Sequence, residues 1–221
     1  MISLVLEAST YAGSAALLDG SRLLMERSVA MRGKDHEALM AAVGELLSHS
    51  NVSPAQVDRV ICGAGPGSFT SLRIAGAIAK GISAACGAPL VPVSSLALLI
   101  GALPGRTAGQ YLAVLDAMRG ESYVQEFTVD TDGTIVASGE QAVIATSAVD
   151  ERAKARGSTA VGPTRSGAEH AEPHARGAVA ITNMIESALA ADLAAWEPLY
   201  GRLAEAQVKW EADHGRALDG T

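Results

Sequence analysis

The sequence predicts an α/β protein of two lobes, each lobe being a small mixed sheet flanked by helices. Three observations lead to this prediction. Short apolar runs alternate with longer helical patterns, a tight hairpin near the N-terminus indicates an antiparallel edge, and a glycine-rich turn at residues 63–70 joins a buried strand to a long helix. The chain has 221 residues and 48% hydrophobic content, which is enough to form two small cores.

The N-terminal region begins with strand patterns. Residues 2–6 form a short buried strand, and residues 13–18 and 22–28 form two more. Asp19-Gly20 lies between the second and third strands and is typical of a two-residue hairpin turn. Because a hairpin joins antiparallel strands, we expect an antiparallel edge on the first sheet.

A first long helix is predicted at residues 34–50. Its apolar side chains recur at helical spacing and form one stripe, made of His36, Leu39, Met40, Val43, Leu46 and Leu47. Its other side presents small residues, namely Ala41, Gly44 and Ser48. A single turn opens at Ser53-Pro54, where Pro occupies the first helical position.

A second long helix is predicted at residues 68–86, after a strand at 59–63, and Gly87 should end it. One broad face is apolar and consists of Leu72, Ile74, Ala75, Ile78, Ala79, Ile82, Ala85 and Cys86. The opposite side consists of Gly76, Ala77, Lys80, Ser83 and Ala84, with Arg73 beside them. A strand at 89–93 and an apolar helix ending at residue 103 complete the first lobe.

Pro104-Gly105 marks the expected boundary between an N-terminal lobe (1–103) and a C-terminal lobe (104–221). Strands are predicted at 111–116, 122–129, 134–137 and 159–161. Helices are predicted at 147–156, 178–189 and 202–218, the last a charged helix that we expect to pack back on the first lobe.

The composition limits the possible functions. The chain carries 24 acidic and 17 basic residues, a net charge of −7, so it lacks the basic excess with which proteins grip nucleic acid. Cys62 and Cys86 lie in apolar runs and are predicted to be buried, reduced thiols. No apolar run reaches the length of a membrane span, and we expect a cytoplasmic protein.

The turn Gly63-Ala64-Gly65-Pro66-Gly67-Ser68-Phe69-Thr70 is the sharpest local signal. It is neither a Walker loop nor a dinucleotide fingerprint, because the required Lys and third Gly are missing. A strand that enters a helix through such a turn leaves free N–H groups and a positive dipole end, which suit a phosphate. A tight packing turn is an equally good interpretation of this motif alone.

The ten residues from Gly65 to Ile74 resemble the signature of the TsaB family, relatives of the tRNA threonylcarbamoyladenosine transferase TsaD. Other segments agree in order along the chain: His36-Glu37-x-Leu39, Val93-Ser94-Ser95-Leu96, Leu115-Asp116-Ala117-x-Arg119-Gly120-Glu121-x-Tyr123 and Pro198-x-Tyr200-x-Arg202. The resemblance covers most of the chain and is weakest between about residues 130 and 195.

This resemblance implies a two-lobed, actin-like or sugar-kinase-like fold and a non-catalytic role. TsaB-like proteins pair with a TsaD-like subunit, and with a TsaE-like ATPase, to make threonylcarbamoyladenosine (t6A) in tRNA. It implies that the chain meets tRNA only indirectly, binds ATP or ADP only within the complex, has no cofactor of its own and forms a homodimer in isolation. It also implies a vestigial nucleotide site at Glu7, Ser9, Thr10, Gly65, Gly67 and Ser68.

The chain departs from the family pattern at three positions. Glu7-Ala8-Ser9 replaces the usual Asp-Thr of the first phosphate loop, Ser71 replaces a Gly, and Gly201 replaces an aliphatic residue. The longer Glu7 side chain weakens the case for nucleotide binding with a metal. A small ATP-dependent phosphotransferase or ATPase of the same fold is the alternative function.

The histidines and serines do not favour catalysis by this chain. His170 and His174 have the spacing of a shared metal face, but Pro173 removes the helix that would present them, so no metal site is predicted. Ser68 has neither a Gly-x-Ser-x-Gly context nor an evident His–Asp pair, which argues against a peptidase. The charged group Asp116, Arg119 and Glu121 either lines a cleft between the lobes or stabilises its own turn.

The small-residue sides of the two long helices predict a surface for a partner helix. An ordinary solvent face is the alternative. The predicted partner surface consists of His36, Ala41, Gly44, Ser48, Arg73, Gly76, Ala77, Lys80, Ser83 and Ala84.

Overall fold

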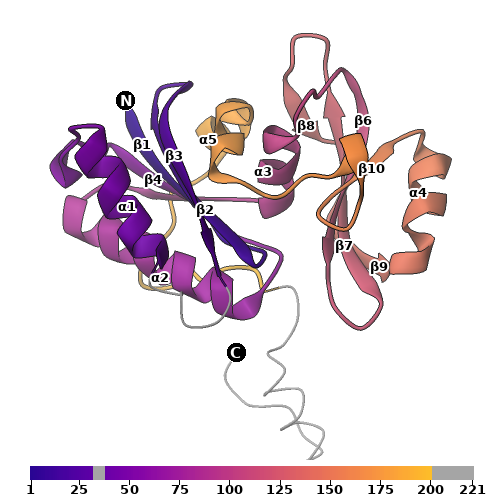
Figure 1. Cartoon of the computed structure of the whole chain (residues 1–221), viewed down its shortest axis with the longest axis horizontal. Coiled ribbons are helices and arrows are strands. Elements are labelled where there is room, and N and C mark those ends of the chain that lie inside the picture. The colour runs from indigo at the N-terminus through magenta and orange to yellow at the C-terminus, as the bar shows by residue number, and fades with distance from the viewer. Residues whose placement is uncertain (32–37, 201–221) are drawn as a thin grey trace, which may run out of the picture.

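The computed structural model describes residues 1–31 and 38–200, which form two mixed sheets with helices against them (Figure 1). The first sheet has the order β3-β2-β1-β4-β5. Its strands are β1 (Ile2–Glu7), β2 (Ala12–Asp19), β3 (Arg22–Ala30), β4 (Arg59–Gly63) and β5 (Leu90–Val93). Strands β1, β4 and β5 are parallel, while β2 and β3 are antiparallel, so the predicted antiparallel edge is confirmed.

The hairpin between β2 and β3 differs by one residue from the prediction. Asp19 pairs with Arg22, so the two residues outside the ladder are Gly20 and Ser21. A register shift between Leu17 and Leu18 adjusts the strand before the turn. Asp19 itself remains in β2, where its carboxylate accepts a hydrogen bond from the N-terminal amine at 3.1 Å.

Helices α1 (Ala38–His49) and α2 (Phe69–Cys86) pack on one face of the first sheet, around a shared apolar cluster (Figure 1). The buried face of α1 is formed by Leu39, Ala42, Val43 and Leu46. Met40 was predicted on the apolar stripe. It follows the buried Leu39, but its own side chain lies outside the buried face and is 51% exposed. The start of the predicted helix, including His36, lies outside the described residues.

Helix α2 has nearly the predicted bounds. It ends at Gly87, whose φ of +68° is the left-handed conformation expected of a glycine stop. Before β4, a single turn, η2 (Pro54–Gln56), occupies the predicted position. Cys62 is fully buried and free, and burial raises the pKa of its thiol, whereas Cys86 is only half-buried.

The second sheet has the order β10-β6-β7-β8, and β9 also pairs with β7. Its strands are β6 (Gly109–Asp116), β7 (Glu121–Val129), β8 (Ile135–Ala137), β9 (Ala142–Ala145) and β10 (Thr159–Val161). Strand β9 was not predicted, because its apolar run is only four residues long. The single turn η3 (Thr146–Ala148) leads into α4 (Val149–Arg156), which packs against this sheet.

Helix α3 (Ser95–Ala102) joins the two sheets. Seven of its eight residues are buried, and five of them, at positions 96–100, belong to one cluster that includes Ile61 and Val91 of the first sheet and Leu115 and Phe127 of the second. Gly101 of α3 lies directly against Gly177, where an added Cβ would overlap backbone atoms. One core cluster is therefore shared by the two sheets, beside a separate cluster under α1 and α2 and another under α4.

The chain after β10 returns to the first sheet. The short turn η4 (Gly167–Glu169) is followed by η5 (Ala175–Val179), which packs on α3 and β2, and then by α5 (Thr182–Ser187). The predicted helix at 178–189 is thus shorter and starts later. Residues 188–200 then run along the first sheet, where the Ala191 N–H donates to the Leu90 carbonyl at 2.8 Å. The predicted helix at 202–218 lies outside the described residues.

The boundary at 103/104 separates the two sheets, but residues 171–200 contact elements of the first one. Across residues 1–31 and 38–200, no helix combines the length and the apolarity needed to cross a membrane.

The contact between Gly101 and Gly177 gives a stability prediction. Gly101→Ala should lower the free energy of unfolding by about 2–3 kcal/mol, because the new methyl overpacks against backbone that cannot move aside. Urea unfolding monitored by circular dichroism measures it. Gly81→Ala is the matched control: Gly81 is an exposed position inside α2 with open space around it, so the same change should stabilise by about 0.5–1 kcal/mol. Equal effects at both sites would contradict the packing account.

Candidate functional site

The end of β1 and the start of α2 meet at the glycine turn, as the sequence predicts. The Ser68 N–H donates to the Ser9 carbonyl at 2.7 Å. Gly67 lies so close to Ser9 that an added Cβ would overlap the Ser9 carbonyl oxygen. Glu7, Ser9, Gly65, Gly67 and Ser68 are therefore brought together in one place.

Glu7 lies at the centre of this site. Its side chain is fully buried, and Oε1 accepts the Ser9 N–H at 2.5 Å. Oε2 accepts the Ser95 hydroxyl at 2.8 Å, and Ser95 Oγ in turn accepts the Gly65 N–H at 3.1 Å. Gly63 has no room for a side chain because Glu7 Oε2 occupies that space. The carboxyl group thus connects β1, the glycine turn and the start of α3.

Burial raises the pKa of Glu7 above its ordinary value of 4.5, and the hydrogen bonds from Ser9 and Ser95 partly oppose this effect. The carboxyl group is enclosed and points into the protein. It acts as a structural tie and presents no oxygen to an incoming ligand.

Three N–H groups of the turn are engaged as well. The Ala64 N–H donates to the Val93 carbonyl at 2.7 Å, the Gly65 N–H to Ser95 Oγ, and the Ser68 N–H to Ser9. A phosphate would have to compete with these internal acceptors. These three bonds fit the packing interpretation of the turn, which the sequence left open beside the phosphate interpretation.

Thr10 is not part of this arrangement, although it was predicted with it. Its Oγ1 lies 3.2 Å from both Glu172 Oε2 and the Ala12 carbonyl oxygen, so its one proton has these two acceptors within reach. Thr10 therefore contacts the returning C-terminal part of the chain instead of the glycine turn.

A segment that the sequence analysis did not place at the site also contacts the turn. We call residues 191–200 the C-terminal strap. The Leu199 N–H donates to the Ala64 carbonyl at 2.7 Å, and the Leu199 carbonyl lies against Gly65. Gly65 has φ +94° and no space for a Cβ, so glycine is required here. The motif Pro198-x-Tyr200 was the sequence signal that could have revealed this contact.

Aromatic side chains hold the end of the strap in place. The Tyr200 ring packs on Phe69 of α2 with 4.5 Å between centroids, and the Tyr123 hydroxyl of β7 donates to the Tyr200 carbonyl at 3.4 Å. The Tyr200 hydroxyl donates to Glu197 at 2.7 Å, and burial together with this bond raises the pKa of Tyr200 to about 12. The strap thus touches both sheets beside the glycine turn.

The strap corrects part of the predicted partner surface. Gly76 was expected on the exposed side of α2, but Pro198 and Trp196 cover it. Ser83 is also buried, and its hydroxyl donates to the Ala88 carbonyl. Lys80 is half-buried, pairing with Glu197 at 3.4 Å.

The remaining described members of the predicted surface are exposed. We call this set the docking surface, and it consists of Ala41, Gly44 and Ser48 of α1 with Arg73, Ala77 and Ala84 of α2. Exposed Met40 adds an apolar side chain next to it on α1.

Two polar clusters lie away from the glycine turn. In the turn after β6, Asp116 Oδ1 accepts the Met118 N–H at 2.8 Å, and Met118 and Arg119 have positive φ, so Asp116 stabilises its own turn.

Within the described ranges, no group of three or more His, Cys, Asp or Glu residues has the geometry of a metal site. Residues 171–174 are not helical, as Pro173 predicts.

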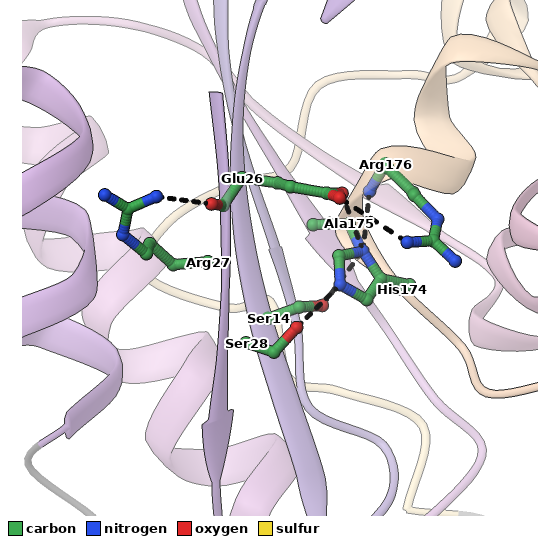
Figure 2. Close-up of polar contacts among 7 residues, drawn as sticks. All are labelled: Ser14, Glu26, Arg27, Ser28, His174, Ala175 and Arg176. Carbon is green, nitrogen blue, oxygen red and sulfur yellow. Dashed lines mark hydrogen bonds and ion pairs between the residues drawn. The ribbon is translucent and has the colours of Figure 1, made fainter. Parts of the chain in front are cut away.

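A Ser–His–carboxylate arrangement that the sequence did not reveal lies between β3 and η5 (Figure 2). His174 Nε2 is 3.0 Å from Ser28 Oγ, and His174 Nδ1 is 3.6 Å from Glu26 Oε2. However, Nδ1 accepts the Arg176 N–H at 3.1 Å, so the proton of the neutral ring is on Nε2. An imidazole in this tautomer donates to Ser28 and cannot act as its base.

Comparison with known proteins decides the family. The family model of TsaD, tRNA N6-adenosine threonylcarbamoyltransferase, matches residues 31–208. The chain belongs to the TsaB/YeaZ family. It is 30% identical over 150 residues to the tRNA threonylcarbamoyladenosine biosynthesis protein TsaB of Escherichia coli (67% of this chain, 64% of that protein). The TsaB of Haemophilus influenzae is 32% identical over 124 residues (56% and 52%).

The chain therefore aligns with between about half and two thirds of these TsaB relatives. Solved structures agree over a longer stretch. A protein from Pseudomonas aeruginosa described as similar to peptidase YeaZ has a TM-score of 0.75 at 26% identity, covering 91% of this chain and 99% of that one. YeaZ from the same organism has a TM-score of 0.71 at 25% identity, with 90% and 99% covered. The family and the α/β fold class predicted from the sequence are both confirmed.

The buried carboxyl group of Glu7 predicts a specific pH dependence. The folded state favours the protonated form, so the stability that Glu7 contributes is present below pH 4.5 and is lost as the pH rises through the raised pKa. Glu7→Gln should therefore gain stability relative to the unmodified chain as the pH rises, by about 1.4 kcal/mol for each unit by which the pKa is raised.

Urea unfolding at a series of pH values measures this difference. Glu151→Gln, at an exposed position of α4, is the control and should show no such trend. If Glu7→Gln instead lost stability relative to the unmodified chain as the pH rises, the folded state would favour the ionised carboxylate, and the prediction would be wrong.

Proposed function

We propose that this chain is a non-catalytic subunit that pairs with a TsaD-like transferase in the synthesis of t6A in tRNA. The observation that carries the proposal is the Glu7 carboxyl group, which fills the space beside the glycine turn and uses the hydrogen bonds of Ser9 and Ser95. Membership of the TsaB/YeaZ family supports the pathway, since the relatives carry the name of threonylcarbamoyladenosine biosynthesis proteins.

The geometry of the turn argues against catalysis by the chain alone. A phosphate entering here would meet a fully buried carboxyl group whose oxygens already accept the Ser9 N–H and the Ser95 hydroxyl, so these donors are not available to it. It would also have to displace Leu199, whose backbone is bonded to the turn. Binding of ATP or ADP is accordingly assigned to the complex, and this chain needs no cofactor of its own.

The docking surface supports a role in assembly. Its exposed residues are small, so a partner helix can approach α1 and α2 closely and bury apolar surface against them. In the absence of the TsaD-like subunit, the same surface serves for a homodimer. With a net charge of −7, the chain is poorly suited to bind tRNA directly. It would contact tRNA, and a TsaE-like ATPase, through the complex.

A charge placed on the docking surface tests this proposal. Ala41→Glu and Ala77→Glu should each weaken binding to the host's TsaD-like subunit about a hundredfold or more, because an unpaired charge would be buried at the interface. The monomer should stay folded, since both positions are exposed. Co-elution and calorimetric titration measure the binding, and circular dichroism verifies the fold.

Ala155→Glu is the matched control, because Ala155 is an exposed helical alanine on α4 beside the second sheet. It should bind like the unmodified chain. Reconstituted t6A synthesis should depend on the chain and fall with the two docking variants but not with the control. Unchanged binding by both docking variants would refute the assigned surface, and full t6A synthesis without the chain would refute the proposed role.

A further inference from the structure

His174 joins two parts of the fold that are far apart in the sequence. It precedes η5, and its ring lies against β3, with the Arg176 N–H on Nδ1 at 3.1 Å and Ser28 Oγ on Nε2 at 3.0 Å (Figure 2). The neighbouring Ala175 N–H donates to the buried Ser14 hydroxyl of β2 at 2.9 Å. The start of η5 is therefore fixed to both strands of the antiparallel edge.

These contacts require a neutral ring of one tautomer. A backbone N–H can only donate, so Nδ1 must be an unprotonated acceptor, and Nε2 then carries the proton that Ser28 accepts. A protonated imidazole has a hydrogen on both nitrogens. It would place the Nδ1 hydrogen against the Arg176 N–H and lose this cap of η5.

Glu26 offers the protonated ring another partner. Its Oε2 is buried and has no hydrogen-bond partner among the described residues, and it lies 3.6 Å from His174 Nδ1. Its Oε1 faces the Arg176 guanidinium at 3.4 Å. Arg27, the next residue of β3, points the opposite way (Figure 2), and its guanidinium pairs with Glu45 of α1 at 3.3 Å. The charged groups that face His174 are thus Glu26 from β3 and Arg176 from η5.

We propose that His174 is a pH-sensitive latch between η5 and β3. In its neutral form it caps η5 and donates to Ser28. In its protonated form it releases the Arg176 N–H and pairs with Glu26 instead.

The direction of the switch follows from the surroundings of the ring. Burial lowers the pKa of His174 below its ordinary 6.5, and Arg176 acts in the same direction, while Glu26 opposes them. The unfolded chain therefore binds the proton more readily than the folded one. The stability contributed by the latch is present above pH 6.5 and is lost as the pH falls through the lowered pKa.

The latch acts on a segment that fills the space between the sheets. Ala171, Ala175, Ala178 and Ile181 belong to the core cluster that α3 shares with both sheets. Glu172 in the same segment accepts the Thr10 hydroxyl at 3.2 Å. Release of His174 therefore loosens the attachment of residues 171–181 to the antiparallel edge while the sheets themselves persist.

Nitrogen-15 NMR of the full-length chain with labelled histidine tests the latch. At pH 8, His174 should be the Nε2–H tautomer, and it should titrate below 6.5. Glu26→Gln should move the midpoint of His174 further down, by about one pH unit, because it removes the charge that favours the imidazolium. The exposed His170 should not move in this variant and serves as the internal reference. A neutral Nδ1–H tautomer, or a midpoint that Glu26→Gln leaves unchanged, would overturn the proposal.

A variant that keeps the cap but cannot titrate completes the test. In His174→Asn, the Asn carboxamide oxygen can accept the Arg176 N–H, since Asn is a preferred capping residue. Amide exchange at Arg176, corrected for intrinsic rates, should speed up about tenfold in the unmodified chain for each unit that the pH falls below the His174 midpoint. It should stay constant in His174→Asn, whereas His170→Asn should behave like the unmodified chain. Acceleration of equal size in His174→Asn would rule the latch out.

Discussion

The arrangement of the first sheet and its connections depends on the hydrogen bonds of the buried Glu7 carboxyl group. Its two oxygens accept the Ser9 N–H and the Ser95 hydroxyl, and Ser95 carries the connection on to the Gly65 N–H. One side chain thus fixes the end of β1, the glycine turn and the start of α3. Because α3 lies in the core shared by both sheets, the position of Glu7 also bears on how the two sheets meet.

The C-terminal strap holds the same glycine turn from the outside of the molecule. Leu199 bonds to the turn that Glu7 holds from within, and Tyr200 packs on the first residue of α2. The strap covers Gly76 but leaves Ala77 exposed. The glycine turn is therefore enclosed on both sides, and it sets the direction of α2, whose exposed side we assign to a partner. The site resembles a nucleotide loop in sequence, and we propose that it serves as a structural joint in the fold.

The sequence predicted the elements that local patterns determine. The apolar run of β4 and the glycine stop of α2 gave bounds within a residue or two, and the antiparallel edge followed from the hairpin. The burial of Gly76 could not be predicted, because it depends on Trp196 and Pro198 far along the chain. The same holds for His174, which meets Ser28 across 146 positions of sequence. Strand β9 is apolar but only four residues long, too short for its pattern to indicate a strand. The direction of the Glu7 side chain is a tertiary property that spacing does not encode.

Titration of the isolated full-length chain with ATP and Mg²⁺ tests the central claim most directly, with heat of binding and phosphate release both recorded. If the carboxyl group of Glu7 and the strap occupy the phosphate position, the chain alone shows neither saturable binding at millimolar nucleotide nor turnover. Tight, saturable binding accompanied by ATP hydrolysis or phosphoryl transfer would contradict the account and favour a phosphotransferase of the same fold.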